Sequence, residues 1–271
     1  ADVYWKDAAI TYEQVIEMQP QGKWAEPSAH RALIAYLRLE DLDQFTAERS
    51  LDAADLRPIA LTVDQQRIAD ACERYVAIAL RNGSKEDVPE ALFVAGRLYY
   101  QTNHFEEAGR LLAQFIDLFP GHPKLALDAA RLMLSAFNLN QDGKSLIAWT
   151  NKLIIDPRFN QGKLGETLTA IKSNEEYNKC LELKSTPVQA AECLVRYARA
   201  FPDSNQAPRA IAGAGRFYRE AKRRDDVIAT YRELARAYPE DPRAAQAVFE
   251  IGEIYRECAS FDEAATAYEE F

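Results

Sequence analysis

The stretch 90–123 constrains the fold of this chain most, because its apolar residues recur with the period of two short helices. Its sequence is EALFVAGRLYYQTNHFEEAGRLLAQFIDLFPGHP. The apolar residues stand at i, i+3, i+4 and i+7, which places them on one face of each helix. Polar residues 102–104 separate the two runs. Pro120 and Pro123 end the second run, because proline removes a donor and clashes with the preceding turn. The stretch therefore predicts an antiparallel helix pair.

Two small residues mark the expected crossing of this pair. Gly96 and Ala108 are predicted to lie where the helices cross, because only small side chains let two backbones come that close. A helix pair with large and small apolar positions in this order resembles the tetratricopeptide repeat, whose period is ~34 residues. The resemblance implies an all-α, right-handed superhelical solenoid of antiparallel helix pairs, with a concave groove lined by the first helix of each pair.

Related units follow along nearly the whole chain. In the clearest copy, 207–242, Gly215 corresponds to Gly96 and Tyr231 to Leu112. A further copy contains Gly252. We expect about six to seven repeats, truncated at both ends, so that the sequence is a fragment of a longer protein. The predicted regions are N-terminal repeats over 1–87 with an insertion near 40–62 and a helical turn at 52–55, regular repeats over 88–158, an irregular helix pair over 159–204, and C-terminal repeats over 205–271.

Composition and charge exclude several classes of function. The chain has 271 residues, of which 48% are hydrophobic and 28% charged, as in globular proteins. Its formal net charge of −9 argues against nucleic acid as a partner, since phosphate binding needs a basic surface. No apolar run approaches the ~20 residues that span a bilayer, so we expect no direct membrane insertion of this fragment.

The sequence predicts no catalytic, metal or cofactor site. The three histidines, His30, His104 and His122, are isolated from one another. The motif beginning at His104 is HFEEA, which lacks the second histidine of the zinc motif H-E-x-x-H. The glycines at 213 and 215 lie inside a predicted helix with no preceding strand, which excludes a dinucleotide-binding loop. We therefore expect a non-enzymatic protein without cofactors.

The four cysteines, Cys72, Cys180, Cys193 and Cys258, lie far apart and lack metal-binding spacing. We interpret them as buried thiols that act as small apolar residues. The alternative concerns Cys180 and Cys193, which flank one predicted helix turn. A disulfide between these two would indicate an oxidising compartment.

The groove is the candidate binding site. The residue after each crossing position is expected to point into it, and neighbouring turns of the first helices add further side chains. Arginine binds carboxylates with a bidentate fork and aromatic rings give apolar contact, which suits a partner protein or peptide. The alternative is that these arginines only pair with glutamates on adjacent repeats. The predicted partner-binding residues are Phe93, Arg97, Tyr100, Arg131, Arg216, Arg219, Phe249 and Arg256.

A narrower resemblance lies in how the units end. The endings FPGHP at 119–123, FPDS at 201–204 and YPEDP at 238–242 resemble repeats of bacterial cell-envelope proteins of the barrel-assembly lipoprotein and Tol–Pal coordinator type. This implies a protein-binding scaffold in the periplasm or at the outer membrane; a cytoplasmic location is the alternative. A second possibility is a regulatory repeat domain of a larger protein, whose catalytic or DNA-binding domain lies outside this fragment. The oligomeric state stays open.

Overall fold

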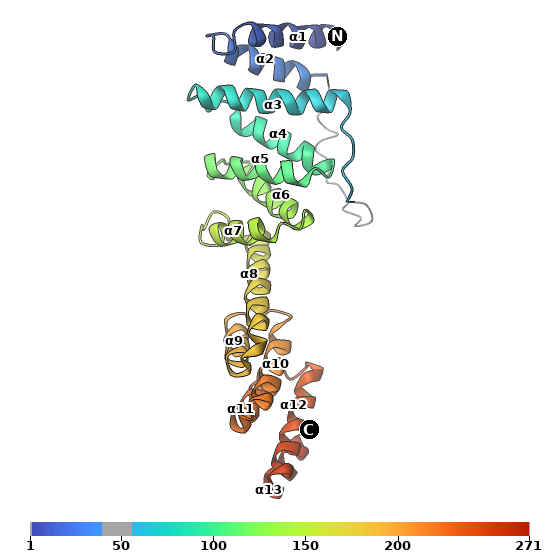
Figure 1. Ribbon diagram of the computed structural model, residues 1–271, viewed down its shortest axis with the longest axis vertical. Helices are drawn as coiled ribbons and strands as arrows, with labels where there is room; N and C mark the ends of the chain where they lie inside the picture. The colour runs from blue at the N-terminus through green and yellow to red at the C-terminus, as the bar shows by residue number, and fades with distance from the viewer. Residues whose placement is uncertain (1, 40–55, 271) are drawn as a thin grey trace. The chain divides into compact units, whose positions relative to one another are not determined.

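The computed structural model describes residues 2–39 and 56–270, and within these ranges the chain is helical with no strand (Figure 1). This confirms the predicted all-α fold. The expected helical turn at 52–55, and most of the expected insertion, lie outside the described residues. The helices are α1 Asp2–Met18, α2 Ala25–Leu37, α3 Val63–Arg81, α4 Val88–Gln101, α5 Phe105–Leu118, α6 Ala126–Leu139, α7 Gly143–Leu153, α8 Gly162–Glu182, the 3-10 helix η2 Leu183–Ser185, α9 Pro187–Ala200, α10 Ala207–Glu220, α11 Arg224–Ala237, α12 Pro242–Glu257 and α13 Phe261–Glu270.

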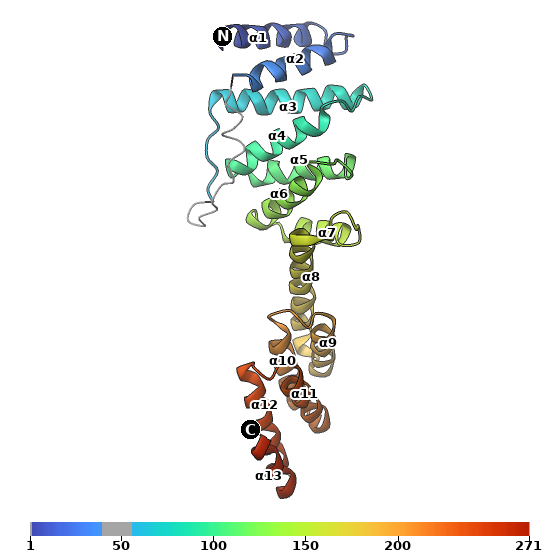
Figure 2. The ribbon, with the colours of Figure 1, turned by 180° about the vertical axis from the view of Figure 1, so that it is seen from behind.

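The chain divides into two compact units, Ala1–Gly165 and Glu166–Phe271, which we call the first and the second unit. In the first unit, each helix from α1 to α7 packs against the next one along the chain (Figures 1 and 2). In the second unit, α9 to α13 pack in the same sequential way. The first helices of consecutive pairs also meet, α4 with α6 and α10 with α12. Packing between neighbours in sequence is typical of a solenoid, and it confirms that expectation.

The turn inside four helix pairs has one backbone geometry. Each turn has three residues, and the middle one adopts a left-handed conformation. In the α4–α5 turn the His104 N–H donates to the Tyr99 carbonyl at 2.8 Å, and the equivalent bond in the other three turns measures 2.9, 2.9 and 3.0 Å. This six-to-one bond is that of the Schellman motif. The middle residues are Asn103, Gln141, Lys222 and Ala259, with φ of 61°, 57°, 58° and 57°.

The aromatic–proline endings form a second repeated geometry, between pairs. Phe119, Phe201 and Tyr238 follow α5, α9 and α11, with φ of −133°, −129° and −136°. Each N–H donates to the carbonyl four residues earlier, at 2.8–3.0 Å. Each carbonyl accepts from the N–H three residues later, at 3.0–3.1 Å. Since proline follows immediately, the helix stops and the chain turns into the next pair.

The crossings within the pairs are close because glycine stands there. A β carbon on Gly96 would lie 2.7 Å from Cγ of Leu112, so Leu112 of α5 lies directly over Gly96. Gly215 meets Tyr231 and Gly252 meets Tyr268 in the same way, which confirms that the three glycines are equivalent. Large side chains of the second helix therefore lie over each glycine.

The cysteines require a correction. Cys180 in α8 and Cys193 in α9 form a disulfide with 5.3 Å between their α carbons. They meet because η2 turns the chain back after α8, and the rings of Tyr177 and Tyr197 pack nearby at 5.4 Å. The interpretation as buried thiols is wrong for this pair, and wrong for Cys258, which is exposed; it is right for Cys72.

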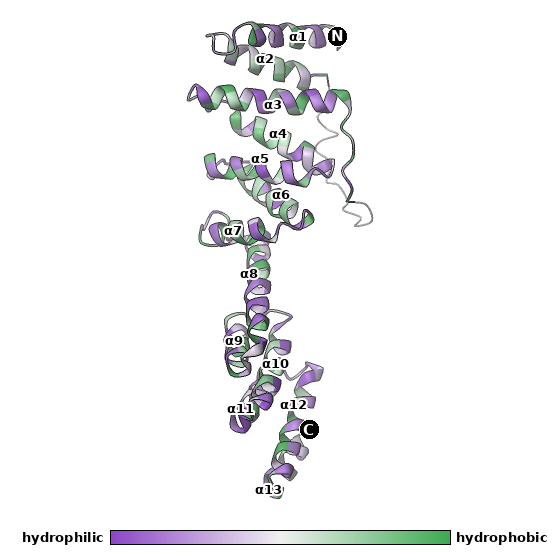
Figure 3. Ribbon diagram, in the orientation of Figure 1, coloured by the Kyte–Doolittle hydropathy of each residue, from purple (hydrophilic) through white to green (hydrophobic). Residues whose placement is uncertain are grey.

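Apolar and polar residues alternate along individual helices, which Figure 3 shows clearly for α3 and α5. Such alternation is typical of helices that bury one face against their neighbours. Among the helices that the structure describes, none has both the length and the apolar character to span a membrane.

Candidate protein-binding groove

A pocket of 410 Å³ lies between α10 and α12, with α11 beneath it. We call it the arginine pocket. Because α10 and α12 are the first helices of consecutive pairs, the pocket lies on the surface that the repeat pattern assigns to the groove. It is lined by Arg209, Ala212, Arg216, Tyr231, Leu234, Arg243, Gln246, Ala247 and Glu250.

Two differences between repeats explain why this space is open. With Gly96 aligned on Gly215, Ala212 stands at the position of Phe93 and Leu234 at that of Phe115. In the first unit, Phe93 is only 9% exposed, and its ring packs against Phe115 at 6.3 Å. In the second unit a methyl group takes the place of that ring. The pocket therefore follows from the exchange of large side chains for smaller ones on an equivalent backbone.

Two guanidinium groups in the pocket have no ion pair with any described residue. Arg209 and Arg216 are exposed and lie seven residues apart, on one face of α10. Arg243 pairs with Asp241 at 2.9 Å. Glu250 is paired with Arg219 at 3.1 Å, so its charge is already compensated. The pocket thus holds an excess of positive charge in a chain whose formal net charge is −9.

Tyr231 forms part of the pocket floor as a neutral hydroxyl. Burial raises the pKa of Tyr231, and a hydrogen bond to Glu250 and the charge of that carboxylate raise it further. The same tyrosine covers Gly215. Tyr231 therefore links the packing of the α10–α11 pair to the wall of the pocket.

Two predicted binding residues are in the core and not in a groove. Phe93 is buried as described above, and Tyr100 is 7% exposed. The Tyr100 hydroxyl shares a hydrogen bond of 2.7 Å with Ser135, and its ring packs against Phe105 at 5.7 Å. The expectation that these two rings are presented to a partner is wrong, because α4 is covered by α5 and α6 on that side.

The predicted arginines fall into two groups. Arg131, Arg219 and Arg256 form ion pairs with Asp128, Glu250 and Glu253 at 2.8, 3.1 and 2.6 Å. Of these pairs, that of Arg219 joins neighbouring repeats, as the ion-pair alternative expected. Arg97 is half-buried and Arg216 exposed, and neither forms an ion pair with a described residue.

Phe249 is 43% exposed, and its ring lies 5.7 Å from that of Tyr268. It is a large apolar side chain on α12, in the second unit, one residue before Glu250 in sequence. Of the predicted aromatics, it is therefore the one whose ring reaches solvent.

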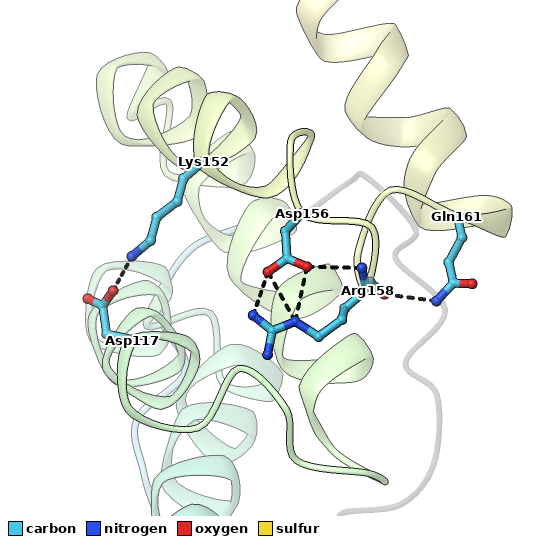
Figure 4. Close-up of polar contacts among 5 residues, drawn as sticks. All are labelled: Asp117, Lys152, Asp156, Arg158 and Gln161. Atoms are coloured by element: carbon cyan, nitrogen blue, oxygen red, sulfur yellow. Dashed lines mark hydrogen bonds and ion pairs between the residues drawn. The ribbon is translucent and has the colours of Figure 1, made fainter.

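A polar cluster after α7 belongs to the fold (Figure 4). Asp156 accepts bonds from the Arg158 guanidinium at 2.6–3.1 Å, and Gln161 donates to the Arg158 carbonyl at 2.9 Å. These bonds lower the pKa of Asp156. Lys152 also pairs with Asp117 of α5. Because the charges pair with one another and fix the loop that follows α7, we assign the cluster a structural role.

Sequence reasoning missed Arg209, Ala212 and Arg243. Arg209 could have been found from its spacing, since it precedes Arg216 by seven residues and so lies on the same helix face. Ala212 could have been found by aligning the repeats, because it replaces a phenylalanine. No cluster of potential metal ligands occurs within the described residues.

The fold and the groove define a helical-repeat protein. Residues 90–122 match the family profile of the tetratricopeptide repeat, so the α4–α5 pair is such a repeat. Three further pairs share its turn, and two of these, α10–α11 and α12–α13, also share its glycine crossing. Comparison with curated proteins found no match.

Proposed function

We propose that this protein is a non-enzymatic scaffold that holds a partner protein or peptide in the grooves of its repeats. The observation that carries the proposal is the arginine pocket, where two guanidinium groups that form no ion pair with a described residue line a surface between first helices. A charged group left without an intramolecular partner is available to one from outside. The tetratricopeptide repeat at 90–122 supports the same class of function.

We further propose that the scaffold works in a bacterial cell envelope, outside the cytoplasm. The disulfide between Cys180 and Cys193 supports this location, because disulfides persist in oxidising compartments and are rare in the cytosol. The resemblance of the aromatic–proline endings to envelope repeats supports it as well. Alkylation of thiols in living cells of the native source tests it, with Cys180 and Cys193 expected to resist until a reductant is added. Ready alkylation without reductant would argue for the cytoplasm.

Site-specific photo-crosslinking tests the binding function. A photoreactive residue at Gln246, in the pocket, and one at Arg97, on α4, should both capture a partner in cells of the native source. The matched control is Ala229, which is exposed on the second helix α11 and does not line the pocket. The same product from both groove positions, absent from Ala229, supports a groove scaffold. Equal labelling from Ala229, or no product from either groove position, contradicts it.

A further inference from the structure

We infer that the arginine pocket binds an extended acidic segment of the partner, with two carboxylates of that segment on Arg209 and Arg216. The inference rests on the proposed scaffold function and specifies the chemistry of what one groove recognises. Its elements are the charge of the pocket, the spacing of the two arginines, and the apolar part of the lining between them.

Charge determines the class of ligand. The guanidinium groups of Arg209 and Arg216 present fork-shaped donors, which match the two oxygens of a carboxylate. Arg243 adds a third positive group, already held by Asp241. Glu250 is engaged by Arg219 and by Tyr231, so it does not cancel the two free charges. An acidic ligand is therefore favoured over a neutral or basic one.

Spacing determines where the acidic groups must stand. Seven residues of α-helix span ~10.5 Å, which is the separation of Arg209 and Arg216 along α10. In a polyproline II segment, residues i and i+3 point the same way and lie ~9 Å apart. Two glutamates or aspartates at i and i+3 of such a segment can thus reach both arginines at once.

The lining of the pocket suits an extended segment. Between the two arginines, Ala212, Leu234 and Ala247 form the apolar part of the lining. The residues between the two acids of the segment would lie on these three side chains.

The α4–α5 pair of the first unit does not offer the same site. Phe93 fills the space that corresponds to Ala212, and Glu90 stands where Arg209 does, so the space is closed and one positive charge is replaced by a negative one. Acidic-segment recognition is therefore assigned to the α10–α12 groove and not to its counterpart at α4.

A peptide titration tests the inference. The probe is a fluorescent proline-rich nonapeptide with glutamates at i and i+3, titrated by fluorescence anisotropy with the full chain. Replacing both glutamates by glutamine should weaken binding at least tenfold, and moving the second one to i+1 should weaken it severalfold. Raising the salt concentration should also weaken binding, because exposed charges are screened. Equal affinity for the glutamine peptide would overturn the inference.

Variants then locate the site. Arg209→Gln and Arg216→Gln should each reduce affinity about tenfold, while Arg236→Gln should leave it unchanged. Arg236 is the matched control, because it is an exposed arginine on α11 with no ion pair to a described residue. Ala212→Phe should abolish binding without lowering the melting temperature, since Phe93 occupies the equivalent position in a folded repeat. Undiminished binding by Ala212→Phe would overturn the assignment of the pocket.

Two further outcomes separate this inference from the scaffold function. If a phosphoserine peptide, with phosphate in place of the glutamates, binds more than tenfold tighter than the glutamate peptide, the pocket recognises phosphate and the inference fails. If Gln246 crosslinks a partner while the acidic peptide does not bind, the scaffold stands and only the acidic-segment inference is overturned.

Discussion

A β carbon on Gly96 would lie 2.7 Å from Cγ of Leu112, closer than real β carbons approach other atoms. The atom in the way is a branch point in the middle of a side chain that is fully buried. Leu112 therefore cannot swing aside, and the α4–α5 crossing depends on the absence of a side chain at residue 96.

Gly96→Leu should destabilise the protein by ~1–3 kcal/mol, because overpacking forces the two helices apart. The control is Gly143→Leu at the start of α7, where an added β carbon meets nothing within 4 Å. Chemical denaturation measures both variants. An equal effect of the two substitutions would contradict the assigned crossing.

At the left-handed turn residues, a substitution is expected to raise the stability of the protein instead of lowering it. Lys222 and Ala259 adopt φ of 58° and 57°, a conformation that costs L-residues roughly 1–2 kcal/mol and glycine almost nothing. Ala259→Gly should stabilise the protein by about 0.5 kcal/mol, after the greater flexibility of unfolded glycine is subtracted. Ala229→Gly, in the exposed middle of α11, should instead cost about 1 kcal/mol. Thermal unfolding distinguishes the two, and a loss of stability in both would refute the Schellman assignment.

The disulfide should stabilise the second unit. Closing a loop of 13 residues restricts the unfolded chain and contributes ~3 kcal/mol in the chain-entropy treatment. A reductant should therefore lower the melting temperature of the native protein and leave that of the Cys180→Ala/Cys193→Ala variant unchanged. Cys258→Ala should respond to reductant as the native protein does. If the double variant were equally sensitive to reductant, the effect would not come from this bond.

A pH dependence follows from four charges on α8. Lys172 and Lys179 bond to both Glu175 and Glu176 at 2.6–3.3 Å. Burial raises the pKa of Glu175, but the bonds from Lys179 and Lys172 outweigh it, and the bond from Lys172 lowers the pKa of Glu176, so both fall below 4.5. The pKa of each glutamate is lower in the folded protein than in the unfolded chain. The stabilisation that the lysine–glutamate bonds provide is therefore present above pH 4.5, and it is lost as the pH falls through the folded-state pKa values.

Lys172→Met/Lys179→Met should therefore melt below the native protein at pH 6, with the difference shrinking as the pH is lowered from 6 to values below 4.5. Lys184→Met serves as the control, because Lys184 is exposed and forms no ion pair with a described residue. A difference that stays constant over this range would show that the lysines act through packing and not through the carboxylates.

The sequence predicted the helix pairs because their determinants are local. Each determinant fixes the structure of a single helix pair. These determinants are the period of the apolar residues, the proline endings, and the glycines at 96, 215 and 252. The burial of Phe93 and Tyr100 was not predictable in that way, since it depends on where the next pair is placed. The arginine pocket was not predictable from the repeat pattern, because the pocket arises from a difference between repeats, Ala212 for Phe93, whereas the pattern consists of what the repeats share.

The exchange of Phe93 for Ala212 has a consequence for how such a chain can acquire new ligands. Both residues stand at the same backbone position, and the helix pairs around them share turns and crossings. A few side chains on a shared backbone thus decide whether a groove is filled or open, so recognition can be gained or lost by point substitutions without rebuilding the scaffold.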